Sequence, residues 1–242
     1  MPNWKLTIAY DGTEYHGWQV QPQQRTVQGE LNDVLEKLFG KRIKTVGASR
    51  TDAGVHATGQ VVSVKLPRKY ETIELHRRMN LMLPDTIAVH KIEEAADDFS
   101  ARYSARGKRY EYRITFEKNP HKRNTALWLM RRPDLDFLQR LSELISGEHN
   151  FTGFAKLQSV PEHPMCTIYN AQWLPTGNGT VFVIEGNRFL HTMVRSIVGA
   201  MLDCERGRFS TEQFAEMLES GKRKYEHKVA NAKGLWLVEV FY

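Results

Sequence analysis

The sequence predicts an α+β fold made of two ferredoxin-like halves, each with the element order βαββαβ. Short segments with alternating or β-branched apolar residues predict strands, and longer segments with apolar residues at helical spacing predict helices. Glycine, proline and aspartate separate these segments, as turn residues do. Because the same order occurs twice, we expect two halves related by a pseudo-twofold axis, with a mainly antiparallel sheet and helices on one face.

The first half, residues 1–98, contains four predicted strands and two predicted helices. The strands are expected at residues 5–10, 44–48, 60–65 and 88–92. The helices are expected at residues 27–38 and 73–83. Gly40 supplies a stop for the first helix, and Pro84 ends the second because its ring cannot continue a helix. Asp11 and Gly12, directly after the first strand, are interpreted as turn residues.

The second half, residues 107–242, repeats this order. Its strands are expected at residues 108–116, 168–174, 180–185 and 235–241. Its helices are expected at residues 135–145 and 190–201, followed by one that a capping box at residues 210–213 opens. Alternation in the first strand places Tyr110, Tyr112 and Ile114 on one face. Since ligands usually bind between domains, we expect a binding cleft where the sheets of the two halves meet.

The composition is that of a globular protein with a modest excess of positive charge. The chain has 242 residues and a formal net charge of +6. This excess suits a phosphate-rich partner, and a scattered basic surface explains it equally well. Cys166 and Cys204 form no CxxC pair, so the sequence indicates neither a zinc site nor a disulfide framework. We expect no membrane span and no signal peptide, and therefore a cytoplasmic protein.

One loop, residues 47–60 (GASRTDAGVHATGQ), holds a single carboxylate beside a single guanidinium. Small residues around Asp52 allow a substrate backbone to come close. In one interpretation Asp52 forms a turn and Arg50 is its exposed ion partner, and pattern alone favours this one. In the other, Arg50 keeps Asp52 ionised, and the carboxylate acts as a nucleophile or base. His56 is interpreted as a polar loop or edge residue, because no second ligand stands at metal-binding spacing.

Basic residues precede the strand that contains Tyr110. They are Arg102, Arg106, Lys108 and Arg109. Cations interleaved with aromatic rings fit a nucleic-acid groove, and they equally fit a solvated charge run beside a core strand. Tyr112 is expected in the core, and Tyr110 is open to either interpretation. The chain has no P-loop and no G-x-S-x-G elbow, which argues against nucleotide hydrolysis and against α/β-hydrolase chemistry.

Residues 47–60 closely resemble the signature of the tRNA pseudouridine synthase A family, whose members isomerise uridines in the anticodon arm of tRNA. Four further segments agree with the family in order. They are AYDGTEYHGWQ with the later VQGEL, FSARYSARGKRYEY, SGEHNFTGF, and FLHTMVRSIVGAML with GLWLVEV. The resemblance covers nearly the whole chain, and its RTDAGVHA core is specific.

The resemblance implies roles for four residues. Asp52 matches the family's catalytic aspartate and is the expected nucleophile, and Arg50 of the same motif is expected to orient or balance it. Tyr110 matches the tyrosine that contacts the target base, and Arg195 matches a basic residue that reaches into the active site. The resemblance also implies one continuous sheet formed by the two halves, and a homodimer that uses no metal or other cofactor.

The implied reaction converts uridine to pseudouridine at tRNA positions 38, 39 and 40, on the 3′ side of the anticodon stem-loop. The target nucleotide leaves its stack by base flipping before it meets Asp52. Two alternatives stay open: a non-catalytic tRNA-binding or folding chaperone, and a sister pseudouridine synthase that acts on another RNA.

The sequence departs from the family pattern at two positions. Ser49 stands where the family usually has glycine, so a left-handed backbone there would carry strain. Asn231 replaces a proline that often precedes the final strand, and we expect this change to affect local rigidity rather than chemistry.

Overall fold

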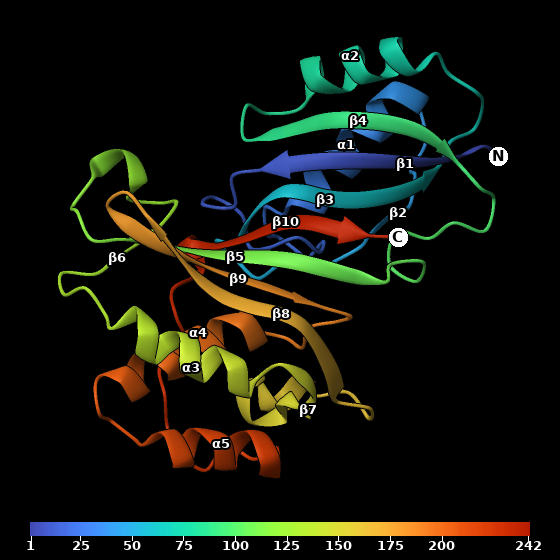
Figure 1. Cartoon of the computed structure of the whole chain (residues 1–242). Helices are drawn as coiled ribbons and strands as arrows, with labels where there is room; N and C mark the ends of the chain where they lie inside the picture. The colour runs from blue at the N-terminus through green and yellow to red at the C-terminus, as the bar shows by residue number, and fades with distance from the viewer. The chain divides into compact units, whose positions relative to one another are not determined.

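The structure, a computed structural model, describes the backbone of residues 1–242 and every side chain but that of Leu157. It divides the chain into two compact units (Figure 1). The first unit is Met1–Arg106 together with Leu237–Tyr242, and the second is Gly107–Trp236. The end of the chain therefore returns to the unit in which the chain begins.

The first unit is a sheet with two helices. Its strands are β1 (Asn3–Tyr10), β2 (Thr45–Gly47), β3 (His56–Lys65) and β4 (Ile87–Ala95), joined by β10 (Leu235–Phe241), which belongs to this unit from Leu237 onward. They lie in the order β4–β1–β3–β10, and β2 pairs with β3. The helices are α1 (Val27–Phe39) and α2 (Thr72–Met82). From β1 to β4 the order along the chain is βαββαβ, as the sequence predicts.

Alternation explains the buried face of this sheet. In β1, Trp4, Leu6, Ile8 and Tyr10 are buried, whereas the residues between them are partly exposed. β1 pairs antiparallel with β3 on one side and with β4 on the other. The core of the first unit therefore lies against the face that these four side chains share.

The second unit is a sheet flanked by helices. Its strands are β5 (Gly107–Thr115), β6 (Leu127–Trp128), β7 (Gly147–Asn150), β8 (Met165–Thr176) and β9 (Gly179–Gly186). They lie in the order β5–β9–β8–β7, and β6 pairs in parallel with β5. The helices α3 (Leu135–Leu144), α4 (Met193–Glu205) and α5 (Thr211–Ser220) lie on one side of this sheet (Figure 1). Short 3₁₀ helices in the connections are η1 (Pro120–Lys122), η2 (Phe151–Phe154), η3 (Leu157–Ser159) and η4 (Ala232–Gly234).

Helix α4 lies in the core of the second unit. Its buried side chains include Met193, Ile197 and Met201, which recur at helical spacing. The sequence predicts that this helix begins at residue 190, but Leu190 precedes it. The Leu190 carbonyl accepts a hydrogen bond from the Met193 N–H at 3.1 Å, which forms a turn before the helix.

The predicted fold class, α+β with a mainly antiparallel sheet, is confirmed. The predicted strands and helices are present, although β3 begins at His56 rather than at residue 60. The capping box before α5 is also confirmed, because Ser210 and Gln213 exchange two side-chain hydrogen bonds, at 2.8 and 3.3 Å. None of the helices among the described residues has the length and apolar character that a bilayer crossing requires.

Candidate active site

The Asp52 loop, residues 48–55, connects β2 to β3 in the first unit. Asp52 is half-buried, Arg50 is exposed, and Thr51 between them is buried. The loop therefore presents a carboxylate and a guanidinium on either side of one inward-facing residue. Both predicted site residues of the first unit belong to it.

Thr51 is anchored by two segments that precede the loop in sequence. Its hydroxyl lies 2.8 Å from the Tyr10 hydroxyl at the end of β1, and its carbonyl accepts a hydrogen bond from the Trp18 N–H at 3.1 Å. The Asp52 carbonyl accepts a hydrogen bond from the Val55 N–H at 3.2 Å, which closes a turn. The backbone on both sides of the Asp52 side chain is therefore hydrogen-bonded.

Gln60, which the sequence does not mark as a site residue, holds the loop from β3. Its side chain is 0% exposed. The side-chain oxygen Oε1 accepts a hydrogen bond from the Ser49 N–H at 3.2 Å, and Nε2 donates one to the Ser49 carbonyl at 2.8 Å. Throughout the described backbone, the non-glycine residues with positive φ are Gln23 and Thr192. Ser49 therefore avoids the left-handed conformation in which it would have been strained.

Gly17 lies so close to the Asp52 loop that only glycine fits. Its φ is 93°, a conformation that side chains disfavour. A Cβ added to Gly17 would lie 2.7 Å from the Thr51 carbonyl oxygen. The segment that contains Tyr15, Gly17 and Trp18 therefore packs directly on the backbone that carries Asp52.

His56 is a buried strand residue, which corrects the prediction that it lies in a loop or at an edge. Its side chain is 0% exposed, and its Nδ1 lies 3.1 Å from the Gly12 nitrogen and 3.2 Å from Asp11 Oδ1. A histidine at this position becomes buried because Gly12 and Asp11, distant in sequence, supply polar partners. The burial of His56 therefore depends on tertiary contacts, which a pattern in a single sequence does not reveal.

Asp11 is a turn residue, as the sequence predicts. Its carboxylate accepts hydrogen bonds from the Thr13 N–H at 2.9 Å and from the Thr13 hydroxyl. Partial burial raises the pKa of Asp11, but these two hydrogen bonds and the nearby His56 together outweigh burial and lower it. Asp11 therefore helps to close the connection that follows β1.

Tyr110 and Tyr112 both lie on β5 in the second unit. Tyr112 is fully buried, as predicted, and its hydroxyl donates a hydrogen bond to the Asn231 carbonyl at 2.8 Å. Burial raises the pKa of Tyr112, against a smaller opposing effect of the Arg195 guanidinium. Tyr110 is 6% exposed, and its ring packs edge-on against that of Phe189 with 5.1 Å between centroids. Tyr110 is therefore a buried residue of the second unit.

Arg195 lies in the first turn of α4 and is half-buried. Its Nε donates a hydrogen bond to the Ala230 carbonyl at 2.8 Å, and the Ala230 N–H donates one to the Arg195 carbonyl at 3.0 Å. One of these bonds ties the guanidinium, and the other ties the backbone of Arg195, to the chain that follows α5. Arg195 therefore has a defined direction within the second unit.

The 228–234 segment, which leads to β10, is attached to α4 through residues 228–230. A Cβ added to Gly199 would lie 1.7 Å from the Lys228 carbonyl oxygen, so the two backbones meet without an intervening side chain. The buried carboxylate of Asp203 accepts a hydrogen bond from the Lys228 N–H at 3.0 Å. Asn231, the residue in place of a proline, caps η4 by accepting a hydrogen bond from the Lys233 N–H at 3.1 Å. Its side chain thus stabilises the turn that proline would restrict.

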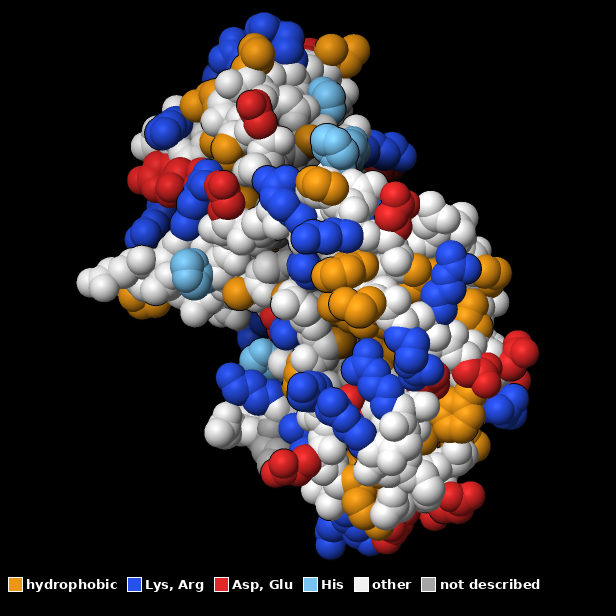
Figure 2. Space-filling model, turned by 90° about the vertical axis from the view of Figure 1, so that its left-hand side faces the viewer, with side chains coloured by type: hydrophobic (Ala, Val, Ile, Leu, Met, Phe, Trp, Pro, Cys, Tyr) orange, Lys and Arg blue, Asp and Glu red, His pale blue; other side chains and the backbone are white. Residues whose placement is uncertain are grey.

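The basic residues before and within β5 have mixed surroundings. Arg109 forms an ion pair with Glu185 on β9 at 2.6 Å, so part of its charge is neutralised within the unit. The Arg102 guanidinium lies 5.4 Å from the centre of the Tyr103 ring, which is 80% exposed. Figure 2 shows several groups of Lys and Arg side chains on one face of the molecule, interspersed with hydrophobic ones. The interpretation as a nucleic-acid surface fits Arg102 and Tyr103 better than Arg109.

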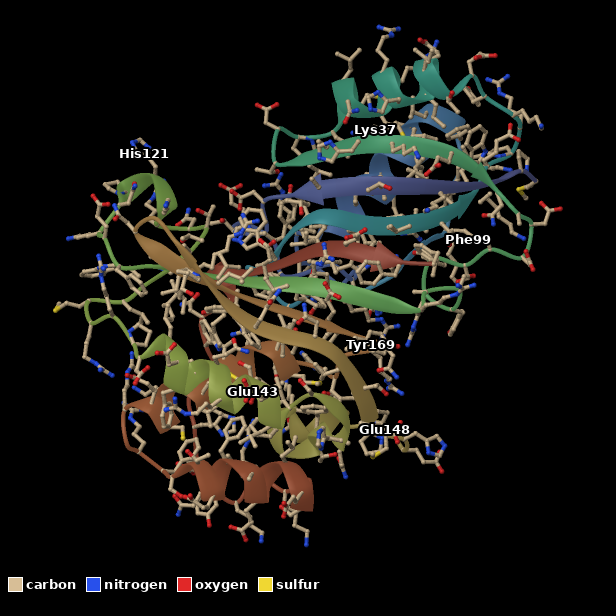
Figure 3. All side chains as sticks on the ribbon, in the orientation of Figure 1. Lys37, Phe99, His121, Glu143, Glu148 and Tyr169 are labelled. Atoms are coloured by element: carbon tan, nitrogen blue, oxygen red, sulfur yellow. The ribbon has the colours of Figure 1, made fainter. Side chains whose placement is uncertain are left out.

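Several side chains point outward from the second unit (Figure 3). His121 lies in η1, at the tip of a projecting connection, and Tyr169 on β8 is 56% exposed. Cys166 and Cys204 are buried free thiols, and burial raises the pKa of both, to about 11 for Cys166. The thiols are therefore protonated at neutral pH and unsuited to nucleophilic chemistry.

Comparisons with known proteins agree with these features. A family model described as tRNA pseudouridine synthase matches residues 6–104 and 142–242. The tRNA pseudouridine synthase A of Acetivibrio thermocellus is 37% identical over an alignment that covers 100% of both chains. The proteins of the same name from Chlorobaculum tepidum and Bacillus subtilis are each 38% identical, over 98% of this chain and 97% and 98% of those proteins.

These matches define the class of protein as a pseudouridine-forming isomerase. More particularly, the chain belongs to the tRNA pseudouridine synthase family, as its motifs predict. The matched ranges contain Arg50, Asp52 and Arg195, whereas Tyr110 lies between them. Among solved structures, a chain of a Cbf5–Nop10–Gar1 complex aligns at 13% identity and a TM-score of 0.34, over 80% of this chain and 52% of that one. That likeness is too distant to bear on function.

Proposed function

We propose that the chain converts uridine to pseudouridine at tRNA positions 38, 39 and 40, with the Asp52 carboxylate as the nucleophile. The observation that carries this proposal is the Asp52 loop, in which a half-buried carboxylate extends from a backbone that is hydrogen-bonded on both sides. Membership of the tRNA pseudouridine synthase family supports tRNA as the substrate.

The proposed reaction needs one anionic oxygen and no redox step. The N1–C1′ bond breaks and C5 of the same uracil bonds to C1′, while C5 loses a proton and N1 gains one. Atoms and electrons therefore balance without a co-reactant. A single carboxylate serves as the attacking group at C1′ or at C6, or as the base that forms a glycal.

We assign the other predicted residues to binding and orientation. Arg50 orients or balances the carboxylate, Arg195 contacts the nucleotide, and Tyr110 stacks on the flipped base. Flipping costs a few kcal/mol, of which stacking on an aromatic ring offsets roughly 1–3 kcal/mol. Because Tyr110 packs against Phe189 and is 6% exposed, its role requires the base to reach the exposed edge of the ring or to displace Phe189.

The proposed setting is a cytoplasmic homodimer that needs no cofactor. Light scattering on the purified protein tests the dimer. We expect a mass near twice the 28.0 kDa of one chain. A mass of one chain at working concentration would contradict this part of the proposal.

Mapping pseudouridine in an unmodified tRNA transcript tests the proposed reaction. The wild-type chain is expected to modify uridines at positions 38, 39 and 40, and transcripts with cytidine at each position in turn assign the individual sites. Binding without product would instead identify a non-catalytic tRNA-binding protein or folding chaperone. Product in other RNA but not in tRNA would identify a sister synthase with a different substrate.

A further inference from the structure

We propose that Gln60 is a positioning residue for Asp52, and that its buried amide sets the path of the backbone from Ser49 to the carboxylate. This inference rests on the proposed function of Asp52. Gln60 does not touch the nucleotide in this account. It acts through the Asp52 loop, and its effect is therefore on turnover rather than on tRNA binding.

At the end of β2, the Gln60 side chain replaces the backbone hydrogen bonds that the neighbouring strand supplies up to Ala48. β2 and β3 pair as antiparallel strands with Gly47 opposite Val62, and the next N–H, that of Ala48, donates to the Val61 carbonyl at 2.8 Å. At Ser49 both bonds come instead from the Gln60 side chain, to the N–H at 3.2 Å and to the carbonyl at 2.8 Å. The side chain thus continues the ladder after the loop backbone has left the sheet.

The chemistry of the amide explains why this position suits glutamine. One planar group supplies an acceptor and a donor with the spacing of a peptide group, as the Ser49 backbone requires. An apolar side chain of the same length removes both of these hydrogen bonds to the half-buried Ser49, at a cost of about 1 kcal/mol each. A carboxylate at this position would keep the acceptor but lack the donor.

The other side of the loop is fixed independently. Thr51 is held by the Tyr10 hydroxyl and by the Trp18 N–H. Arg50 therefore lies between two anchored residues, and Asp52 follows the second anchor directly. Loss of the Ser49 anchor leaves Thr51 in place but frees the segment before it, so the Arg50 guanidinium shifts relative to the Asp52 carboxylate. A displacement of about 1 Å lowers the rate of a positioned reaction by about 10²-fold.

The same unit contains a matched amide that does not touch the loop. Asn80 on α2 accepts a hydrogen bond from the Val89 N–H on β4 at 2.8 Å and donates one to the Val89 carbonyl at 2.9 Å. The two amides therefore make the same pair of bonds to a backbone residue. They differ in the part of the fold that they hold. The bonds of Gln60 hold Ser49, which leads to Asp52, whereas the bonds of Asn80 join α2 to β4.

The test compares Gln60→Met with Asn80→Leu, since each replaces an amide with an apolar side chain of similar shape. Melting temperature, tRNA dissociation constant and single-turnover rate are measured on unmodified tRNA. We expect both variants to have lower melting temperatures than the wild type and the same tRNA dissociation constant. Only Gln60→Met is expected to lose rate, by about 10²-fold. Equal rates for the two variants would overturn the inference.

A second variant keeps the test decisive if Gln60→Met does not fold. Gln60→Glu retains the shape and the acceptor, and we expect it to lose rate while it still binds tRNA. Failure of both Gln60 variants to fold, with Asn80→Leu folded, would also overturn the inference, because Gln60 would then be a determinant of folding. Activity in Asp52→Asn refutes the proposed function. An inactive Asp52→Asn together with fully active Gln60 variants refutes only the role of Gln60.

Discussion

The two units hold their predicted site residues through different sets of contacts. In the first unit, side chains from other elements hold the Asp52 loop: the Gln60 amide bonds the Ser49 backbone, and the Tyr10 hydroxyl lies 2.8 Å from the Thr51 hydroxyl. Each of these bonds depends on one side-chain group. A substitution can therefore remove an anchor of the loop without moving the strands beneath it.

In the second unit, close contact between backbones joins the 228–234 segment to α4, in addition to the side-chain bonds of Arg195 and Asp203. The Ala230 N–H bonds the Arg195 carbonyl, and Gly199 leaves no room for a Cβ beside the Lys228 carbonyl. A change at such a contact moves a helix or a chain segment. We therefore expect substitutions around the Asp52 loop to change activity at a modest cost in stability, and substitutions around Arg195 to destabilise the second unit as well.

The largest effect on stability is expected for Gly199→Ala. Its added Cβ would lie 1.7 Å from the Lys228 carbonyl oxygen, and both groups are backbone-attached, so α4 or the 228–234 segment must shift. Overpacking of this kind costs about 3 kcal/mol, the upper part of its usual range. Urea unfolding measures the loss. Gly177→Ala, with no atom within 4 Å of its added Cβ, is the control and is expected to match the wild type.

A smaller loss of stability and a loss of turnover are expected for Gly17→Ala. The substitution places a side chain at a φ of 93° and 2.7 Å from the Thr51 carbonyl oxygen. The backbone strain alone costs about 1–2 kcal/mol. Gly40→Ala isolates that strain, because Gly40 has a φ of 67° and no atom within 4 Å of its added Cβ. Equal turnover in the two variants would show that Gly17 does not support the Asp52 loop.

Tyr112→Phe is expected to cost about 1 kcal/mol, the contribution of one buried hydrogen bond. The substitution removes the hydroxyl that donates to the Asn231 carbonyl and leaves the buried ring in place. Tyr103→Phe removes a hydroxyl from an exposed ring and is the matched control. Unfolding in urea compares the two. No difference between them would mean that the Asn231 contact does not hold the 228–234 segment.

The smallest effect expected is a difference in the pH range over which the two units lose stability. Burial and the nearby Arg223 lower the pKa of His227 below its ordinary value of about 6.5, so the unfolded chain takes up that proton first. Stability from His227 is therefore lost as pH falls below about 6.5. Asp11 has a lowered pKa as well, and its contribution is lost only as pH falls below about 4.

Melting temperatures between pH 7 and pH 5 separate these two groups. We expect the melting temperature of His227→Gln to fall less than that of the wild type between pH 7 and pH 5. For Asp11→Asn we expect the same fall as in the wild type. A decline that persists in His227→Gln would assign the acid sensitivity to other groups.

The sequence predicts the fold well where local pattern decides it. Alternation predicts β1, and the Ser210 to Gln213 capping box predicts the start of α5. The sequence does not predict the strands β6 and β7, because both are short and β7 (GEHN) is polar. Their pairing depends on neighbouring strands rather than on their own residues.

The candidate site is predictable only in part. The motif marks Asp52 and Arg50, but the Ser49 contact of Gln60 depends on the register of β2 against β3, which a single sequence does not give. The burial of His56 likewise depends on Gly12, which lies on a different segment. A motif can mark candidate catalytic residues such as Asp52. The contacts of residues such as Gln60 become known only when the pairing of the strands is known.

The most direct measurement of the central claim is a single-turnover assay of Asp52→Asn on unmodified tRNA. Asp33→Asn, at an exposed position of α1, removes the same charge elsewhere in the first unit and is the control. We expect both variants to bind tRNA as the wild type does, Asp33→Asn to form pseudouridine at the wild-type rate, and Asp52→Asn to form none. Pseudouridine formation by Asp52→Asn at the rate of the control would contradict the account.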